Sequence, residues 1–217
     1  MNPNPRIRYE KERSDSKQQR LHTILEAAEH VFTQKGIDKT TMQDIAHSAN
    51  IGIATLFRYF PKKEKLIVAV ANKLMEPMLY QFQAIADLPI SCLEQLERLF
   101  DFFIEDHHNS SIKFMVDFES YASHSLEPIE DIHAFNALSR SISQQYARII
   151  ENGIKDGSIR ADLPIEEVLI TVVNTFGLFS KKLSLHNNIL LFESELDSDH
   201  QLRLLKKLML DYLKAPL

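Results

Sequence analysis

Residues 50–66, which read NIGIATLFRYFPKKEKL, combine three features that suit contact with a polyanion. A glycine and small residues precede a run of aromatic side chains, so a helix that begins there has an N-terminus without bulk. Pro61 ends the aromatic run, and lysines follow at positions 62, 63 and 65. Lysine cations and the unpaired backbone N–H groups of a helix start can together bind a phosphate. These residue types therefore indicate binding of a phosphate backbone.

Two short helices joined by a tight turn are expected to position these residues. The segment TMQD at 41–44 is typical of a capping box, in which Thr41 accepts the backbone N–H of Asp44. The residues that follow predict a helix over 41–49, the turn NIG, and a second helix over 53–60. This is the helix-turn-helix arrangement, which places its second helix in the major groove of DNA. The alternative is an ordinary corner between two helices whose lysines are solvated.

Spacing within the second helix separates an inner face from an outer face. Ile51, Leu56 and Phe60 are spaced to face a small core. Gly52 and Ala54 carry little bulk, so the helix start can approach bases closely. Polar and aromatic groups on the outer face can reach phosphates or base edges. The outward side chains are expected to be those of Ile53, Thr55, Arg58 and Tyr59.

A further helix is expected before this pair, over residues 21–35. Its apolar residues recur at the three- and four-residue spacing of an amphipathic helix, and Gly36 follows as a typical C-terminal cap. Together the three helices predict a small DNA-binding domain. The polar segment 1–18 has no apolar core of a secretory signal and is expected to be a flexible leader.

Charge divides the chain in the same way. Residues 1–75 carry 13 Lys and Arg against 8 Asp and Glu, a net charge of +5, within a chain of net charge −5. The remaining residues therefore carry −10. A cationic end on an acidic body suits a protein that touches a polyanion with one end only. The alternative is a chance excess on a solvated basic tail.

The rest of the 217-residue chain is predicted to be helical, which makes the fold class all-α. Amphipathic patterns and proline positions predict helices at the following ranges: 91–107, 111–124, 128–156, 164–185 and 198–213. The longest apolar stretch, 168–179, is shorter than the roughly 20 residues that span a bilayer. A single cysteine, Cys92, excludes an intramolecular disulfide and is expected to be inert at a helix start, with a redox-sensing role as the alternative. The expected location is the cytoplasm.

Residues 21–66 closely resemble the N-terminal DNA-binding domain of the TetR family of bacterial transcriptional regulators. The pattern is followed without a gap, for example at Lys35–Gly36, Thr40–Thr41, Asp44–Ile45–Ala46 and Lys63–Glu64. After the leader at 1–18, the resemblance implies a three-helix DNA-binding domain at 19–66 and a larger helical ligand-binding and dimerisation domain at 67–217.

The resemblance also implies which residues touch DNA. In the family, the positions of Thr41, Thr55 and Lys63 commonly contact phosphates. The chain departs from the family at several positions; Phe57, for example, stands where a tyrosine hydroxyl usually contacts phosphate, and Tyr59 is a possible replacement. The expected DNA-binding residues are Thr41, Gly52, Ile53, Ala54, Thr55, Phe57, Arg58, Tyr59 and Lys63.

By the same resemblance, the last two long helices pair with those of a second copy in a four-helix bundle. The alternative is that their apolar faces form the core of a single chain. The residues expected at the dimer interface are Leu169, Val173, Phe176, Leu202, Leu205 and Met209.

A ligand pocket is expected among the helices from 91 to 185. Asp117 shares a helical face with aromatic residues, and an acid in such a setting can hold a cationic ligand, although plain core packing is the alternative. The candidate lining residues are Phe103, Phe114, Asp117, Phe118, Tyr121, Phe135, Ile142, Tyr146 and Phe176.

The sequence carries no pattern typical of an enzyme. It has no glycine-rich phosphate loop, zinc-protease motif or nucleophile elbow, and we expect no cofactor. The one histidine grouping, His107, His108, His124 and His133, is interpreted as structural or exposed rather than metal-binding.

The predicted function is a homodimeric repressor that binds a palindromic operator in double-stranded DNA and is released by a small apolar or amphipathic effector. One alternative is a TetR-like protein controlled by a protein or peptide partner. Another is a helical protein that sequesters a ligand without binding DNA.

Overall fold

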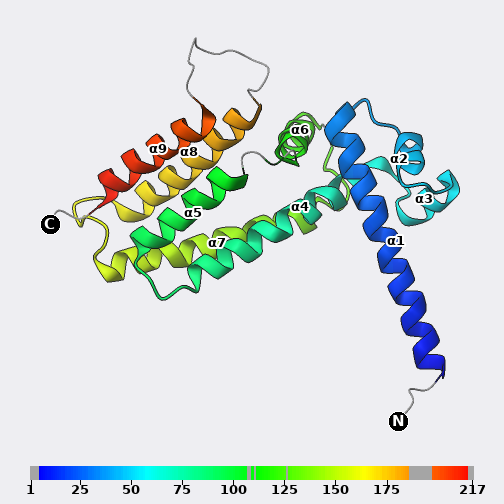
Figure 1. The fold of residues 1–217 in the computed structure, drawn as a ribbon, viewed down its shortest axis with the longest axis horizontal. Coiled ribbons are helices and arrows are strands. Elements are labelled where there is room, and N and C mark those ends of the chain that lie inside the picture. The colour runs from blue at the N-terminus through cyan, green and yellow to red at the C-terminus, as the bar shows by residue number, and fades with distance from the viewer. Residues whose placement is uncertain (1–4, 107–108, 110, 126, 186–196, 215–217) are drawn as a thin grey trace. The chain divides into compact units, whose positions relative to one another are not determined.

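The computed structural model describes residues 5–106, 109, 111–125, 127–185 and 197–214. Its regular elements, within those ranges, are helices, which confirms the predicted all-α class (Figure 1). In chain order they are α1 (Pro5–Lys35), α2 (Met42–Ser48), α3 (Ile53–Tyr59), α4 (Lys63–Ala86), α5 (Cys92–Asp106), α6 (Ser111–His124), α7 (Ile132–Asp156), α8 (Ile165–Leu185) and α9 (Ser198–Leu213).

The helices form two compact units, each with its own core. The N-terminal unit consists of the chain up to Lys73 together with Asp117–Phe135, and the C-terminal unit consists of Leu74–Val116 with Asn136–Leu217. The expected division at residue 66 differs from this one because α4 runs unbroken through it. In addition, the end of α6 and the segment that follows it belong to the N-terminal unit.

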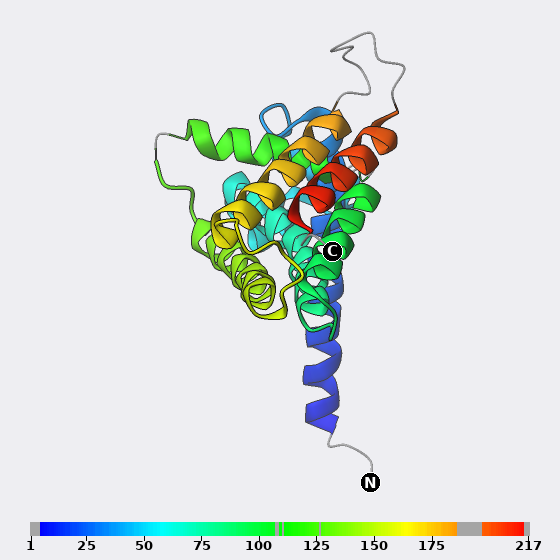
Figure 2. The same ribbon diagram turned by 90° about the vertical axis from the view of Figure 1, so that its left-hand side faces the viewer.

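Helix α1 begins at Pro5, so the expectation of a flexible leader over 1–18 is not met in its described part. Proline suits the first turn of a helix, and no glycine or further proline interrupts the sequence before Gly36. Figure 2 shows the first turns of α1 extending beyond the other helices of the N-terminal unit. Each described side chain from Glu12 to Arg20 is exposed.

The core of the N-terminal unit forms where α1 and α4 pack with α2 and α3. Ile24 and Phe32 of α1, Ile45 of α2, Leu56 of α3 and Leu66 of α4 are each fully buried. Burial of one such side chain contributes about 1.5–3 kcal/mol. Each of these contributions exceeds that of a helix cap, at about 1 kcal/mol. Apolar packing therefore holds the helix-turn-helix together, while caps set where its helices begin.

In the C-terminal unit, α5, α8 and α9 pack against one another around a continuous apolar core. The ring of Phe100 in α5 stacks on that of Phe176 in α8 with their centres 4.4 Å apart. Cys92, at the start of α5, is fully buried, and burial raises the pKa of its thiol to about 12. The thiol is therefore protonated and shielded, which agrees with the expectation of an inert cysteine.

A buried amide closes the end of α4. Gln95 of α5 is fully buried, and its Nε2 donates to the carbonyl oxygens of Ile85, Ala86 and Leu88 at 3.2–3.3 Å. Its Oε1 accepts from Nδ2 of Asn152 at 3.1 Å. The side chain therefore adds hydrogen bonds to carbonyls at and just after the end of α4, and it links α4, α5 and α7 within the C-terminal unit.

Helix α8 is long and apolar enough, by length and composition alone, to span a membrane. The apolar stretch 168–179, which is too short to span a bilayer, is only the central part of this helix. Its apolar side chains Leu169, Val172, Val173 and Phe176 are buried in the C-terminal core. Core packing therefore accounts for these four apolar side chains of α8.

Candidate nucleic-acid interface

The start of α2 is fixed by a capping box. Thr41 is the N-cap residue; its hydroxyl oxygen accepts from the backbone N–H of Asp44 at 3.1 Å, and Asp44 in turn accepts from the backbone N–H of Thr41 at 3.0 Å. Lys35 Nζ also lies 2.6 Å from Oδ1 of Asp44. The pKa of Asp44 is lowered to about 2. The hydrogen bond from Lys35 is the largest cause, and the hydrogen bonds from the backbone N–H and the hydroxyl of Thr41 come next. The capping box that the sequence predicted is confirmed.

The turn between α2 and α3 depends on Asn50, whose φ is +51°. Asparagine tolerates this left-handed conformation better than most residues, so it stands in for a turn glycine. Gly52 then caps α3 at a φ of −67°, where any residue is allowed. A Cβ at Gly52 would meet no described atom within 4 Å, so the space in front of α3 is open.

Helix α3 presents most of its surface outward. Leu56 is fully buried, whereas Ala54, Phe57 and Arg58 are exposed. The exposed fraction of Phe57 is 45%, high for an apolar ring. An exposed helix with an open N-terminus and a cation in its last turn has the form of a recognition helix.

The other outward residues of α3 are half-buried. These are Ile53, Thr55 and Tyr59. The guanidinium carbon of Arg58 lies 6.0 Å from the centre of the Tyr59 ring, at the edge of cation–π range. The two side chains therefore form the C-terminal end of the exposed surface of α3.

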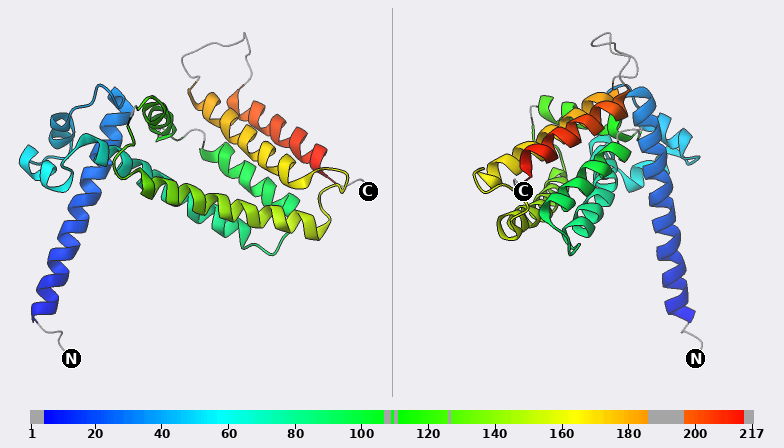
Figure 3. Two further views of the ribbon diagram at one scale, coloured as in Figure 1. Left: turned by 180° about the vertical axis from the view of Figure 1, so that it is seen from behind. Right: turned by 60° about the vertical axis from the view of Figure 1, so that its left-hand side comes forward.

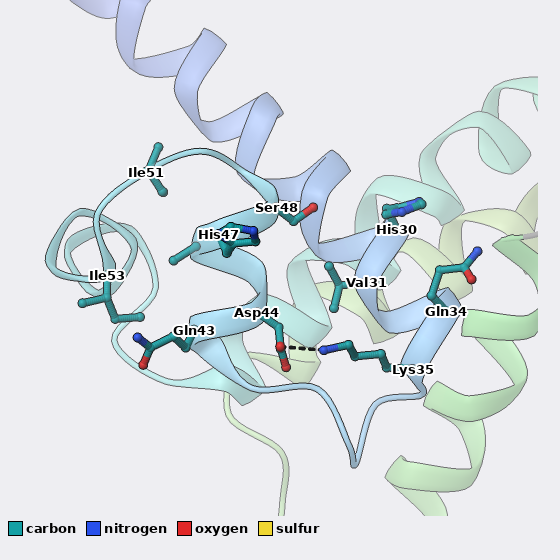
Figure 4. A pocket seen from close by; sticks show the side chains of 11 residues that line it. His30, Val31, Gln34, Lys35, Gln43, Asp44, His47, Ser48, Ile51 and Ile53 are labelled. Carbon is teal, nitrogen blue, oxygen red and sulfur yellow. Dashed lines mark hydrogen bonds and ion pairs between the residues drawn. The ribbon is translucent and has the colours of Figure 1, made fainter.

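An open groove of about 730 Å³ runs between α1, α2 and α3 (Figure 4). Its apolar floor includes Val31, and Ile53 lies at the end formed by α3. Lys35 and Asp44 pair across one side of it. The lining residues are His30, Val31, Gln34, Lys35, Gln43, Asp44, Ala46, His47, Ser48, Ile51 and Ile53. The groove places α1 beside the first residue of the recognition helix.

The lysines at the start of α4 are not a free cationic cluster, in contrast to the expectation. Lys62 Nζ lies 2.9 Å from Oε2 of Glu130, and Lys65 Nζ lies 3.0 Å from Oε1 of the same residue and 3.1 Å from Oδ2 of Asp131. Hydrogen bonds from Lys62 and Lys65 lower the pKa of Glu130. Lys63, in contrast, donates to the carbonyl oxygen of Asp38 at 3.2 Å. The acids come from the segment before α7, which sequence spacing gives no means of finding.

The residues predicted to line a ligand pocket fall in two different units. Asp117, Phe118, Tyr121 and Phe135 belong to the N-terminal unit, where the rings of Phe118 and Phe135 are 4.9 Å apart. Burial, and then the nearby charge of Glu64, raise the pKa of Tyr121. These four therefore pack within the helix-turn-helix unit, and the ligand pocket around Asp117 stays a prediction.

The other predicted lining residues belong to the C-terminal unit. Phe103, Ile142 and Tyr146 are partly buried against its core, and Phe114 and Phe176 are fully buried. The hydroxyl of Tyr146 donates to the carbonyl oxygen of Leu169. Burial raises the pKa of this hydroxyl. The ring is thus anchored to α8.

Four of the six residues predicted for the dimer interface are core residues instead. Leu169, Val173, Phe176 and Leu202 are between 0% and 8% exposed within the single chain. They offer no area to a second chain, because α5, α8 and α9 already cover them. Leu205 and Met209 are partly buried against the same core. The exposed apolar side chains of α8 and α9 are Ile170, Leu178, Leu185, Leu204, Leu208 and Tyr212.

Among the described residues, no group of three or more His, Cys, Asp or Glu side chains is placed to hold a metal ion. His124 and His133 are exposed, and the remaining two members of the predicted grouping, His107 and His108, lie outside the described residues.

Comparison with known proteins identifies the N-terminal part. Residues 24–70 match the model of bacterial regulatory proteins of the tetR family. The chain is 28% identical over 151 residues to the HTH-type transcriptional repressor KstR2 of Mycolicibacterium smegmatis. The aligned region covers 69% of this chain and 72% of that protein.

Solved structures agree with the whole fold. The ketosteroid transcriptional regulator KstR2 of Mycobacterium tuberculosis has a TM-score of 0.63 at 21% identity, over 91% of this chain and 96% of that one. The transcriptional regulator FadR of Bacillus subtilis, in complex with stearoyl-CoA, has a TM-score of 0.68 at 14% identity, over 89% and 99%. At these identities the likeness shows a shared fold: a helix-turn-helix domain followed by a helical domain.

Proposed function

The chain belongs to the TetR family of bacterial regulatory proteins, and from this premise we propose that it is a homodimeric repressor that binds a palindromic operator and is released by a small-molecule effector. The observation that carries the proposal is the exposed α3, with open space at Gly52 and Arg58 in its last turn. Such a helix enters the major groove, where base edges are distinguishable. Thr41, Thr55 and Lys63 are the proposed phosphate contacts.

Dimerisation is proposed through the exposed stripe of α8 and α9. Leu204, Leu208 and Tyr212 follow at four-residue spacing on α9, and Ile170 and Leu178 are exposed on α8, which packs beside it. Large exposed apolar side chains on two neighbouring helices are typical of an interface. Two copies related by a two-fold axis would present two copies of α3 to the two halves of a palindrome.

The effector is proposed to be a small apolar or amphipathic molecule held in the C-terminal unit. The apolar, phenylalanine-rich core of that unit supports this proposal, as does the acyl-CoA complex of the structurally similar FadR. Release follows by population shift if the effector binds more tightly to the dimer conformation that does not fit the operator. The protein is proposed to work in the cytoplasm, without catalytic activity of its own.

Selection of binding sites from random-sequence DNA tests the DNA-binding function directly. The expected result is a palindromic motif, and recovery of no enriched sequence would refute the proposal. Mass spectrometry of the purified protein for retained small molecules then tests the class of effector.

Sedimentation tests the dimer. Wild-type protein should sediment at about twice 25.1 kDa, and Leu208→Glu at about 25.1 kDa. Leu88→Glu is a matched control, because Leu88 is also an exposed leucine but lies outside α8 and α9. Dimerisation of all three proteins would exclude the α8–α9 stripe as the interface.

A further inference from the structure

The first turns of α1 carry cations on one side of the helix. Arg13, Lys17 and Arg20 are exposed and follow at i, i+4 and i+7, the spacing that places side chains on one helical face. At 100° per residue, Asp15 falls on the opposite side, about 140° to 160° from these residues, and Glu12 falls about 80° to 140° from them. We name Arg13, Lys17 and Arg20 the α1 cationic stripe.

The stripe continues the face by which α1 holds the helix-turn-helix. Ile24 follows Lys17 by seven residues, and Val31 follows Ile24 by seven, so all three share a face. Ile24 is fully buried, and Val31 lies on the floor of the groove that ends at Ile53 of α3. The cations therefore lie on the face of α1 that Ile24 and Val31 share. The left panel of Figure 3 shows α2 and α3 projecting from one side of α1.

Distance along the helix separates the stripe from the groove beside the recognition helix. At a rise of about 1.5 Å per residue, Arg20 and Arg13 lie about 17 and 27 Å along α1 from Val31. That reach is comparable to half to three-quarters of a turn of B-DNA, which repeats about every 34 Å. A row of exposed cations that continues a DNA-binding surface is suited to bind the phosphate backbone of DNA.

We infer that the α1 cationic stripe binds the phosphate backbone of DNA flanking the operator half-site, as a second, sequence-independent contact. This inference rests on the proposed DNA-binding function. Such a contact adds affinity for longer DNA without changing the preferred sequence, because phosphates carry no base information. It also steepens the salt dependence of binding, by about 0.9 per phosphate neutralised.

A pair of variants separates the position of the charges from their number. Lys17→Gln with Arg20→Gln removes two stripe cations. The second variant exchanges neighbours, by Lys17→Gln, Gln18→Lys, Gln19→Arg and Arg20→Gln, so composition is conserved while the cations leave the stripe face. Gln, Lys and Arg have similar helix propensities, so α1 should be equally stable in both variants. Circular dichroism of each full-length variant checks this.

Two duplexes serve as probes. The short duplex contains only the site that the wild-type protein selects from random DNA. The long duplex contains the same site with a full helical turn added on each side. On the long duplex, the wild-type protein should lose about a hundredfold more affinity than either variant between 50 and 200 mM salt, because two phosphate contacts per protomer, four in the dimer, change the slope by about 3.6. On the short duplex, all three proteins should bind alike.

Three other outcomes would contradict the role of the stripe, its position outside the half-site, or DNA binding itself. If the exchanged variant binds the long duplex as the wild type does, only total charge matters and the stripe is not a contact surface. If both variants lose affinity equally on the short duplex, the residues act within the half-site, and the flanking contact is excluded. If the wild-type protein binds neither duplex, the DNA-binding function itself fails, and this inference fails with it.

Discussion

The amine of Lys65 in the first turn of α4 lies 3.0 Å from the carboxylate of Glu130, which belongs to the segment just before α7. The same amine lies 3.1 Å from Asp131, whose φ of +66° is rare for a residue other than glycine. Two segments far apart in the chain are therefore joined within the N-terminal unit, close to the lysines expected to meet DNA. A DNA phosphate and Glu130 would compete for the same cations.

Glu130→Gln should strengthen binding to all DNA sequences. Without the carboxylate, Lys62 and Lys65 are available to phosphates, and the salt slope should steepen by up to about one unit for each lysine that gains a contact. Titration of a fixed duplex at several salt concentrations measures this. Glu127→Gln is a control, because Glu127 is exposed in the same segment and forms no ion pair with a residue that the structure describes. Weaker DNA binding by Glu130→Gln would mean that the ion pair supports the domain and does not compete with DNA.

Lys63→Ala should weaken binding to every DNA sequence alike and lower the salt slope by about one unit per protomer, as loss of a single phosphate contact does. Lys63→Arg retains the cation and should retain most of the affinity. A changed sequence preference for Lys63→Ala would assign this residue to the bases instead. Unchanged affinity would leave Lys63 only its hydrogen bond to the Asp38 carbonyl.

Ile53→Ser tests base reading at the start of α3. An aliphatic side chain there can pack on the C5-methyl group of thymine in the major groove, so wild-type protein should prefer thymine at one position of each half-site. The variant should lose about 1 kcal/mol of that preference, with little change in salt dependence. Binding sites selected by both proteins from random DNA provide the measurement. Identical motifs would place Ile53 with the groove beside α1 and α2, and not with the DNA.

The pKa of Asp44 predicts a pH dependence of stability. Because the pKa is held at about 2, below its ordinary value of 3.8, the ionised carboxylate stabilises the folded state. This contribution is fully present above pH 3.8 and is lost as the pH falls through about 2. The Tm of Asp44→Asn should therefore lie below that of the wild type at pH 5, and the difference should shrink as the pH is lowered to 2. If the difference in Tm stayed constant with pH, the charge of Asp44 would not contribute to stability.

Gly153→Ala should destabilise the C-terminal unit. A Cβ there would lie 2.8 Å from Sγ and 3.2 Å from Cβ of Cys92, whose backbone N–H is fixed to Asp156 at 2.6 Å. Overpacking of this kind costs about 1–3 kcal/mol, against a gain of about 1 kcal/mol from helix propensity.

Gly177→Ala is the matched control within α8. The nearest atoms to its Cβ are ring carbons of Phe103 at 3.7 and 3.8 Å, an ordinary contact. Thermal unfolding should therefore rank Gly177→Ala at or above the wild type and Gly153→Ala below it. The reverse order would show that α7 can move away from α5.

The helices of the DNA-binding domain were predictable because their signals are local. The capping box of Thr41 and Asp44, the turn at Asn50 and the buried position of Leu56 each depend on residues within a few positions along the chain. The start of α1 at Pro5 was missed, since a charged segment without an apolar face gives no periodic signal.

Contacts between distant segments were decided by the tertiary structure alone. Glu130 pairs with Lys62 and Lys65 because the segment before α7 folds onto the N-terminal unit, and no spacing rule relates residues so far apart. In α8, apolar residues occupy more than one face, so the sequence could not tell Leu169, which is buried, from Ile170, which is exposed. A helix that is apolar on several sides buries the side its neighbours cover, and only packing against α5 and α9 determined which side that was.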